Sequence, residues 1–489
     1  MSQKELHKGP NRSQDDYFGM SHSVLLNHLR TETRKSKGKP PANKIADFFT
    51  KRLWTWFYYY ISSRFGRDYP YVTYTSPDDN GIYRLKGAEN GQPAENRHAA
   101  ENAQAPENAQ PAENGRAGVC IALVADWGTD TTQSFEVASK MQGHHPDYTI
   151  HLGDTYYVGA PHEIELNFTQ PDAPWVRGSK GSFALLGNHE MYARGIAFFE
   201  KLLPTLGIKD AAGHYTGQKA GFFCLENDHW RILGLDTGYH SIGKIPLIEL
   251  LPGLGPDCHF DKKLMQWLHD DCRLQDKNDK RGLLILTHQQ YITAFDDEDE
   301  YPVPAEQLAT LIGKDRPVLW IWGHEHKFSM YEKVQLKNGI TAYGRCIGHG
   351  GMPVELASSS FKPNDSKSGA SKLVMVDTRM QPGTHSYPLG YNGYVVLEIK
   401  EERLEIGYFD VHGKLFSESW LADIRTGTIT GSIDPPKSTT PKSATPGSAT
   451  PGSATPGSTT PGPNPPRSSA PGPAVLKTAG DRPWSDAVK

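Results

Sequence analysis

Five short apolar runs in the middle of the chain each lead into polar residues of a few kinds. The runs VCIALVA, YTIHL, SFALL, LLILT and VLWIW are separated by stretches long enough for helices and loops. Continuous apolar runs of this length are typical of strands in a sheet with both faces covered. Since open α/β sheets gather side chains at the carboxyl ends of their strands, we expect the polar residues after these runs to meet.

Further strand-like runs follow, among them TAYGRCI, YNGYVVLEI and RLEIGYF. A single sheet would not accommodate so many strands comfortably, so they indicate a second sheet packed on the first. We therefore predict an α/β fold for residues 118–425, in which two sheets form a β-sandwich flanked by helices.

Two segments have compositions that do not support a packed core. Residues 88–117 repeat Ala/Pro-Glu-Asn every six residues, and residues 426–489 are rich in Pro, Thr, Ser and Gly. Neither segment offers enough large apolar side chains to offset the entropy lost on ordering. We expect a disordered linker within the first range and a disordered tail in the second.

Residues 1–87 form a separate N-terminal part that is basic and aromatic. Within it, the apolar positions of residues 45–61 (IADFFTKRLWTWFYYYI) follow helical spacing. Docking of this helix on the α/β domain is the favoured interpretation, with peripheral membrane contact through residues 45–61 as the alternative; binding of nucleic acid is not expected. After it, YVTYT and IYRL flank Asn80-Gly81, a pair that favours a tight turn and predicts a β-hairpin.

Composition narrows the class of protein. The net charge of −4 is small for 489 residues and argues neither for nor against a polyanionic partner. The five cysteines are scattered without a CxxC pair, so no disulfide framework or zinc knuckle is expected. The sequence shows neither an apolar secretory signal nor a run long enough to span a membrane, which favours a cytoplasmic location.

The polar residues after the five runs are metal-binding types. They are Asp126, Asp154, Asn188 with His189, His288, and the pair His324 and His326. Any one of them has a structural explanation, such as capping a turn. Together, carboxylates, an amide and imidazoles form a set that binds hard to borderline metal ions. Because one ion would be overcoordinated, the set predicts two ions that share a carboxylate.

This order of motifs resembles the calcineurin-like metallophosphoesterases. The motifs here are Asp126, Gly153-Asp154, Gly187-Asn188-His189-Glu190, His288 and Gly323-His324-Glu325-His326, and the resemblance covers Gly118 to Ile347. It implies their α-β-β-α sandwich. Many members carry a metal-binding histidine two residues after the first Asp, but this chain has Gly128 there.

A tyrosine is placed to fill that gap. Tyr157 completes Gly-Asp-x-x-Tyr, and with Asp-x-Gly this motif is similar to the purple acid phosphatase branch, whose tyrosinate binds a ferric ion. A phenolate is a hard anionic donor that suits Fe(III). If the strand continued, Tyr156 would point to the opposite face, so position favours Tyr157.

The resemblance implies a role for each residue. Asp126, Asp154, Tyr157 and His326 hold a ferric ion, while Asp154 bridges to a second ion, Fe, Mn or Zn, that is completed by Asn188, His288 and His324. His189 contacts the phosphate or protonates the leaving group. Catalytic roles are assigned to His189 and Asp154. The expected enzyme is a binuclear hydrolase in which metal-bound hydroxide attacks a small phosphate monoester, as in acid phosphatases. A phosphodiesterase with the same metals and a non-catalytic scaffold are the alternatives.

Four further features have simpler explanations than a role in the site. His349 follows a strand, and a role in its loop is favoured over contact with the phosphate. Asp236 ends a strand without a place in the ligand set and is expected to be structural. The acidic run of residues 296–300 (DDEDE) is expected to be solvated rather than to bind a cation. Tyr192 and Arg194 lie just past the Asn-His motif, where a structural role is favoured over a place in the pocket wall.

Overall fold

The computed structural model describes residues 58–59, 66–76, 78–85, 118–243, 255–296, 298–336, 338–356, 361–362, 372–382, 388–434 and 477–478. The predicted basic helix of residues 45–61 lies outside these ranges except at residues 58–59, which are helical. The repeats of residues 88–117 and the tail residues 435–476 and 479–489 also lie outside them.

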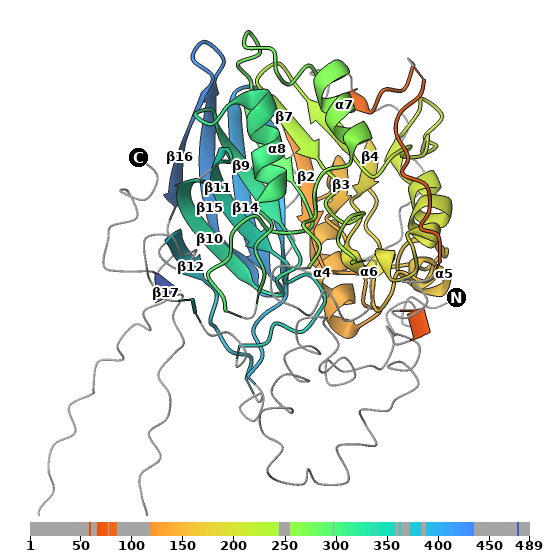
Figure 1. Cartoon of the computed structure of the whole chain (residues 1–489). Helices are drawn as coiled ribbons and strands as arrows, with labels where there is room; N and C mark the ends of the chain where they lie inside the picture. Colours follow the sequence, from red (N-terminus) through yellow and green to blue (C-terminus); the bar gives the residue numbers. More distant parts are fainter. Residues whose placement is uncertain are drawn as a thin grey trace, which may run out of the picture.

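Eight strands form a mixed sheet in the order β16-β15-β14-β13-β2-β3-β4-β5 (Figure 1). Their bounds are β2 (Val119–Val124), β3 (Tyr148–His151), β4 (Gly181–Ala184), β5 (Gly207–Ile208), β13 (Gly393–Lys400), β14 (Arg403–Asp410), β15 (Gly413–Asp423) and β16 (Thr428–Asp434). The central strands β2, β3 and β4 are parallel to one another. The strands β13 to β16 form an antiparallel meander beside β2.

Nine strands form the second sheet in the order β1-β6-β7-β8-β9-β11-β10-β12-β17. Their bounds are β1 (Ile82–Arg84), β6 (Phe223–Glu226), β7 (Trp230–Gly234), β8 (Gly282–Leu286), β9 (Pro317–Trp322), β10 (Phe328–Gln335), β11 (Thr341–Ile347), β12 (Leu373–Val376) and β17 (Lys477–Thr478). Here β7, β8, β9 and β11 are parallel. Each sheet therefore has a parallel centre.

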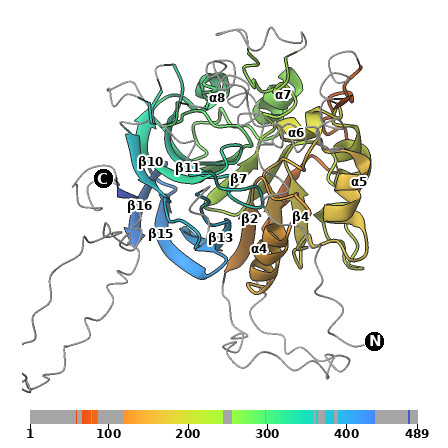
Figure 2. The same cartoon turned by 90° about the horizontal axis from the view of Figure 1, so that it is seen from below.

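The helices cover the outer faces of the two sheets (Figure 2). They are α4 (Thr132–Gln142), α5 (Pro161–Ile164), α6 (Asn188–Met191), α7 (Lys262–Asp270) and α8 (Val303–Ile312), with the single turns η2 (Glu165–Thr169), η3 (Phe198–Leu202) and η4 (Leu203–Thr205). The helices α7 and α8 pack on the nine-stranded sheet, and α4 packs on the eight-stranded sheet. The predicted sandwich of two sheets flanked by helices is confirmed.

The apolar run of β2 is unbroken because both faces of this strand are buried. Ile121 and Leu123 point into the core between the sheets, whereas Ala122 and Val124 lie beneath α4. Successive side chains of a strand alternate between its faces, and here both faces are buried. The smaller residues of β2 are on the side where the helix approaches.

The N-terminal part corrects one prediction. Residues 66–76 and 78–85, here named the N-terminal strap, do not form the expected hairpin: the second run becomes β1, which pairs in parallel with β6. The first run lies along the domain, where Tyr74 donates its hydroxyl to Phe222 O at 2.7 Å and packs near Trp267 of α7. Contacts with the main domain therefore outweigh the local turn preference of Asn80-Gly81.

The end of the sheet corrects a second prediction. β16 adds residues 428–434 to the meander, so the sheet continues beyond the boundary expected at residue 425. Alternating Thr, Ile, Gly and Ser residues gave this edge strand little apolar signal. All five cysteines are buried, and none of them forms a disulfide. Among the described residues, no helix has both the length and the apolar character needed to cross a bilayer.

A buried ion pair joins the two sheets. Arg345 of β11 donates to both carboxylate oxygens of Glu418 of β15, at 2.7 and 2.8 Å. The hydroxyl of Tyr408 and the indole N–H of Trp420 donate to the same carboxylate at 2.6 and 2.9 Å. Both charged side chains are almost fully buried, so each depends on the other for compensation.

Replacing Glu418 with Ala is expected to lower the free energy of unfolding by about 3–5 kcal/mol, because it leaves Arg345 charged and unpaired in the core. Urea unfolding of the metal-free chain measures the loss. The matched control is Glu405→Ala, which removes the partly exposed partner of Arg403 and should cost at most about 1 kcal/mol. Equal losses in the two variants would contradict the interpretation.

Candidate metal centre

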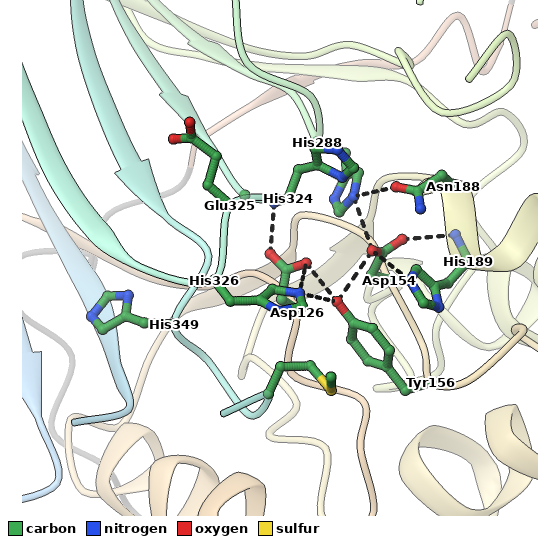
Figure 3. A network of polar contacts seen from close by, with 12 residues as sticks. Asp126, Asp154, Tyr156, Asn188, His189, His288, His324, Glu325, His326 and His349 are labelled. Atoms are coloured by element: carbon green, nitrogen blue, oxygen red, sulfur yellow. Dashed lines mark hydrogen bonds and ion pairs between the residues drawn. The ribbon is translucent and has the colours of Figure 1, made fainter. Parts of the chain in front are cut away.

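The polar residues predicted to meet do so, at the carboxyl ends of parallel strands from both sheets (Figure 3). Asp126, Asp154 and Asn188 follow β2, β3 and β4 of the eight-stranded sheet, and His288, His324 and His326 follow β8 and β9 of the other. Asp126, Asp154 and His288 are at most 1% exposed. The site thus lies where the two parallel centres face each other.

Three of these residues have a left-handed backbone. The φ angles of Asp126, Asp154 and His324 are 54°, 70° and 66°. This region costs a residue with a side chain about 1–3 kcal/mol, and such strain persists mainly where the surroundings impose it, often at functional sites. Here the strain turns each side chain out of its strand and toward the others.

One oxygen of each aspartate is fixed by the backbone of another loop. Asp126 Oδ2 accepts the N–H of His324 at 2.8 Å, and Asp154 Oδ1 accepts the N–H of His189 at 2.9 Å. The second oxygens face side chains instead. Asp126 Oδ1 lies 3.5 Å from His326 Nε2, and Asp154 Oδ2 lies 3.1 Å from His288 Nε2.

Lone pairs of three groups converge around His288. Its Nδ1 donates to Leu152 O at 2.9 Å, so Nε2 carries a lone pair in the neutral ring. This atom faces Asn188 Oδ1 at 3.2 Å and Asp154 Oδ2 at 3.1 Å. These three groups repel one another unless a cation or a proton lies among them. Candidate ligand atoms of Asp154, His288 and His324 all lie within 4.8 Å of one another, which fits a metal ion.

The close contacts around Asp154 and His288 also shift the pKa values of these two residues. Burial opposes the ionised form of Asp154, yet the imidazoles of His288, His189 and His324 hold the pKa of its carboxyl well below its usual range. Burial also opposes a charge on His288, yet the carboxylate of Asp154 raises the pKa of this imidazole to about 9. Without a metal ion, a proton on His288 therefore supplies the positive charge that Asp154 requires.

The tyrosine of the cluster is Tyr156, and the prediction of Tyr157 is corrected. The Tyr156 hydroxyl lies 2.8 Å from Asp126 Oδ1, 2.8 Å from His326 Nε2 and 3.2 Å from Asp154 Oδ2. The prediction assumed that β3 continued with alternating faces, but β3 ends at His151 and a turn follows. Tyr157 contributes its backbone carbonyl, which His189 Nδ1 contacts at 2.6 Å.

His189 lies beside the candidate ligands with its Nε2 toward Asp154. Its Nδ1 bonds to Tyr157 O, so Nε2 is the atom that faces Asp154 Oδ2, at 3.8 Å. Its ring packs at 4.3 Å from the ring of Tyr156 and at 5.2 Å from that of Tyr192. Burial lowers the pKa of His189. The ring is therefore held in one orientation with one nitrogen toward the site.

Two residues that received no role from the sequence support the candidate ligands. Glu190 accepts the N–H groups of Gly187 and Asp154 at 2.9 and 3.2 Å, and so links the loops that carry Asn188 and Asp154. Gln289 donates to Asn188 Oδ1 at 3.4 Å. Glu190 closes the Gly187-Asn188-His189-Glu190 motif, and the neighbouring His288 was the only signal for Gln289.

The weaker candidates lie outside the cluster. Figure 3 shows His349 apart from it, and its ring packs near Phe328. Glu325 points away from the ligands in the same view. Two residues of the acidic run pair with lysines: Glu298 with Lys327, and Glu300 with Lys362. This run therefore compensates lysine charges.

Part of the chain matches a known protein family, and its fold is similar to that of several solved structures. Residues 121–328 match the calcineurin-like phosphoesterase family. No curated protein matches the chain in sequence. Among solved structures, it is similar to GAP50, an anchor in the inner membrane complex of Plasmodium, with 12% identity, a TM-score of 0.36, and coverage of 60% of this chain and 85% of that one. It is similar also to PhoD, with 12% identity, a TM-score of 0.39, and coverage of 64% and 71%.

Proposed function

We propose that this chain, whose residues 121–328 match the calcineurin-like phosphoesterases, hydrolyses small phosphate monoesters with two metal ions. The observation that carries the proposal is the position of Asp154 Oδ2. This oxygen lies 3.2 Å from the hydroxyl of Tyr156 and 3.1 Å from Nε2 of His288, so it belongs to two groups of donors at once.

The donors divide into two sets around that oxygen. Asp126, Asp154, Tyr156 and His326 would hold the first ion, and Asp154, Asn188, His288 and His324 the second. Tyr156 takes the position that the sequence had suggested for Tyr157. A phenolate favours a hard trivalent ion, so we propose Fe(III) for the first set, with Fe, Mn or Zn in the second. This assignment corresponds to the purple acid phosphatase branch.

Bound at these positions, the ions would supply charge that neutralises phosphate oxygens and lowers the pKa of water. The contribution of the chain is orientation and proton transfer. Tyr157 O holds His189 by Nδ1, which leaves Nε2 to contact the phosphate or, when the ring carries a second proton on Nε2, to give that proton to the leaving oxygen. The loops that carry the ligands are joined by Glu190, so the donors are held in place before the substrate binds.

The test of the function compares two aryl esters on the metal-loaded chain. We expect p-nitrophenyl phosphate to be hydrolysed with a higher kcat/KM than bis(p-nitrophenyl) phosphate, and the activity to disappear after chelation and return with metal. A higher kcat/KM for the diester would instead identify a phosphodiesterase. Absence of metal-dependent hydrolysis of either ester would leave a non-catalytic scaffold.

A pair of tyrosine variants tests the first ion. Tyr156→Phe removes the hydroxyl that lies among Asp126, Asp154 and His326. Loss of a residue that merely supports a ligand lowers metal affinity by roughly 10- to 100-fold. Tyr156→Phe should lower the affinity for the first ion by at least this factor and abolish the visible absorption of ferric tyrosinate. Tyr157→Phe is the matched control and should retain both the affinity for the first ion and the visible absorption. A spectrum that is lost in Tyr157→Phe and kept in Tyr156→Phe would contradict the assignment.

A further inference from the structure

Thr237 and Gln289 lie behind the ligand Asn188 and belong to none of the metal-binding motifs. Both are buried, at 1% and 2% exposure, and they come from the loops that follow β7 and β8. We propose that they form a relay that holds Asn188 with its amide oxygen toward the second metal ion. Thr237 and Gln289 are thus positioning residues, and their role rests on the proposed binuclear centre.

The direction of the first hydrogen bonds is fixed by chemistry. The backbone N–H of Gln289 can only donate, and it donates to Thr237 Oγ1 at 3.1 Å. The threonine hydroxyl has one proton, which it donates to Gln289 Oε1 at 2.5 Å. Two contacts between the same residues therefore fix the glutamine amide, with its oxygen toward Thr237.

The second end of the glutamine then determines the orientation of Asn188. With Oε1 occupied, Nε2 faces Asn188 and lies 3.4 Å from its Oδ1. An amide nitrogen can only donate, so the atom it meets must be the asparagine oxygen. Rotation of the Asn188 amide by 180° would oppose two N–H groups and withdraw the oxygen from His288 Nε2, which it now approaches at 3.2 Å.

This orientation matters because only one end of the asparagine amide binds metal. The oxygen has lone pairs for a cation, whereas the planar NH₂ group has none available. The two ends are nearly identical in size, so packing alone distinguishes them poorly. Polar partners outside the ligand shell typically supply this kind of selection in metal sites.

The N-terminal strap holds the loop of Thr237. The N–H of Tyr239 donates to Asp236 Oδ1 at 3.0 Å, and the hydroxyl of Tyr239 donates to Tyr69 O at 2.6 Å. The N–H of Tyr69 in turn donates to Arg194 O at 2.9 Å, just after α6, the helix that begins at Asn188. One strap residue thus bonds to both loops that determine where Asn188 lies.

The experiment titrates Mn²⁺ into the chelator-treated full chain and measures free Mn²⁺ by electron paramagnetic resonance. Wild type should bind two ions. Thr237→Val keeps the shape of the side chain and removes the hydroxyl. It should lower the affinity for one Mn²⁺ ion by about 10- to 100-fold and leave the affinity for the other unchanged. Thr237→Ser keeps the hydroxyl and should bind both ions with an affinity near that of wild type.

A second variant shows whether Thr237 acts through Gln289. Gln289→Met preserves the approximate volume without the amide, and should weaken the same ion. When Thr237→Val and Gln289→Met are combined, the loss of Mn²⁺ affinity should not exceed that of Gln289→Met alone, because the two residues form one relay. Additive losses would overturn the relay, since they indicate independent effects on the fold.

Other outcomes also have definite meanings. If either Thr237→Val or Gln289→Met binds two Mn²⁺ ions as wild type does, the relay is wrong, even if the thermal unfolding temperature falls. If wild type itself binds fewer than two ions, the proposed binuclear centre fails, and the relay fails with it. If wild type binds two ions and the variants bind both with the same affinity, the binuclear centre stands and the relay alone is excluded.

Discussion

Replacing Asp154 with Asn is expected to remove metal binding and phosphatase activity together. The substitution preserves the shape of the side chain but replaces the shared anionic oxygen, which lies 3.1 Å from His288 Nε2 and 3.2 Å from the Tyr156 hydroxyl. Both donor sets lose their common charge. Metal ions supply several kcal/mol of transition-state stabilisation, and each 1.4 kcal/mol is tenfold in rate, so turnover should fall by at least about 10³-fold.

The matched control is Asp147→Asn, a carboxylate just before β3 that accepts the N–H of Cys120 at 3.0 Å and pairs with Lys180. This control should keep both metal ions and normal turnover, because Asp147 lies at the opposite end of β3 from Asp154. Elemental analysis and p-nitrophenyl phosphate hydrolysis are measured on both variants. An Asp154→Asn chain that retained two metal ions and normal turnover would exclude the shared carboxylate.

Replacing His189 with Ala is expected to reduce kcat by about 10²- to 10⁴-fold, the usual contribution of a positioned acid or base. Metal content should remain unchanged, because Nδ1 of His189 bonds to Tyr157 O and its Nε2 stays 3.8 Å from Asp154 Oδ2. The combination of retained metal and lost turnover separates His189 from the ligands. Loss of a metal ion in this variant would place His189 among them.

The leaving group distinguishes the two possible roles of His189. If its Nε2 protonates the leaving oxygen, the variant should lose more activity on an alkyl phosphate than on p-nitrophenyl phosphate, whose phenolate departs without a proton. If it contacts the phosphate, the two losses should be equal. The comparison uses kcat/KM for both substrates with wild type and His189→Ala.

The convergence of most candidate ligands was predictable because it depends on local sequence. An apolar run fixes a buried strand, and a polar residue directly after it lies at the carboxyl edge of the sheet wherever neighbouring strands are parallel. This reasoning needs no knowledge of distant contacts. It therefore placed Asp126, Asn188 and His288 together, and the geometry agrees.

Tyr156 shows where local reasoning fails. Alternation of side chains holds only while the backbone remains extended. After β3 the chain turns, with Asp154 at φ 70°, so the face of each later residue depends on the loop and not on its position in the sequence. The choice between two adjacent tyrosines was outside the reach of the pattern.

The strap and the relay show a different limit. β1 pairs with β6, whose residues lie about 140 positions later in the chain (Ile82 with Cys224), and Thr237 contacts Gln289 across 52 positions. No periodicity or motif links such residues. Their contacts depend on tertiary packing, which overrode the turn preference of Asn80-Gly81 and determined which polar residues support Asn188.

The metal content of the purified chain tests the binuclear centre most directly. Expression in medium supplemented with iron, manganese and zinc should yield two metal ions per chain by elemental analysis, with iron in the set that contains Tyr156. A chain that contained no iron, manganese or zinc under these conditions would contradict the binuclear phosphatase and favour the scaffold.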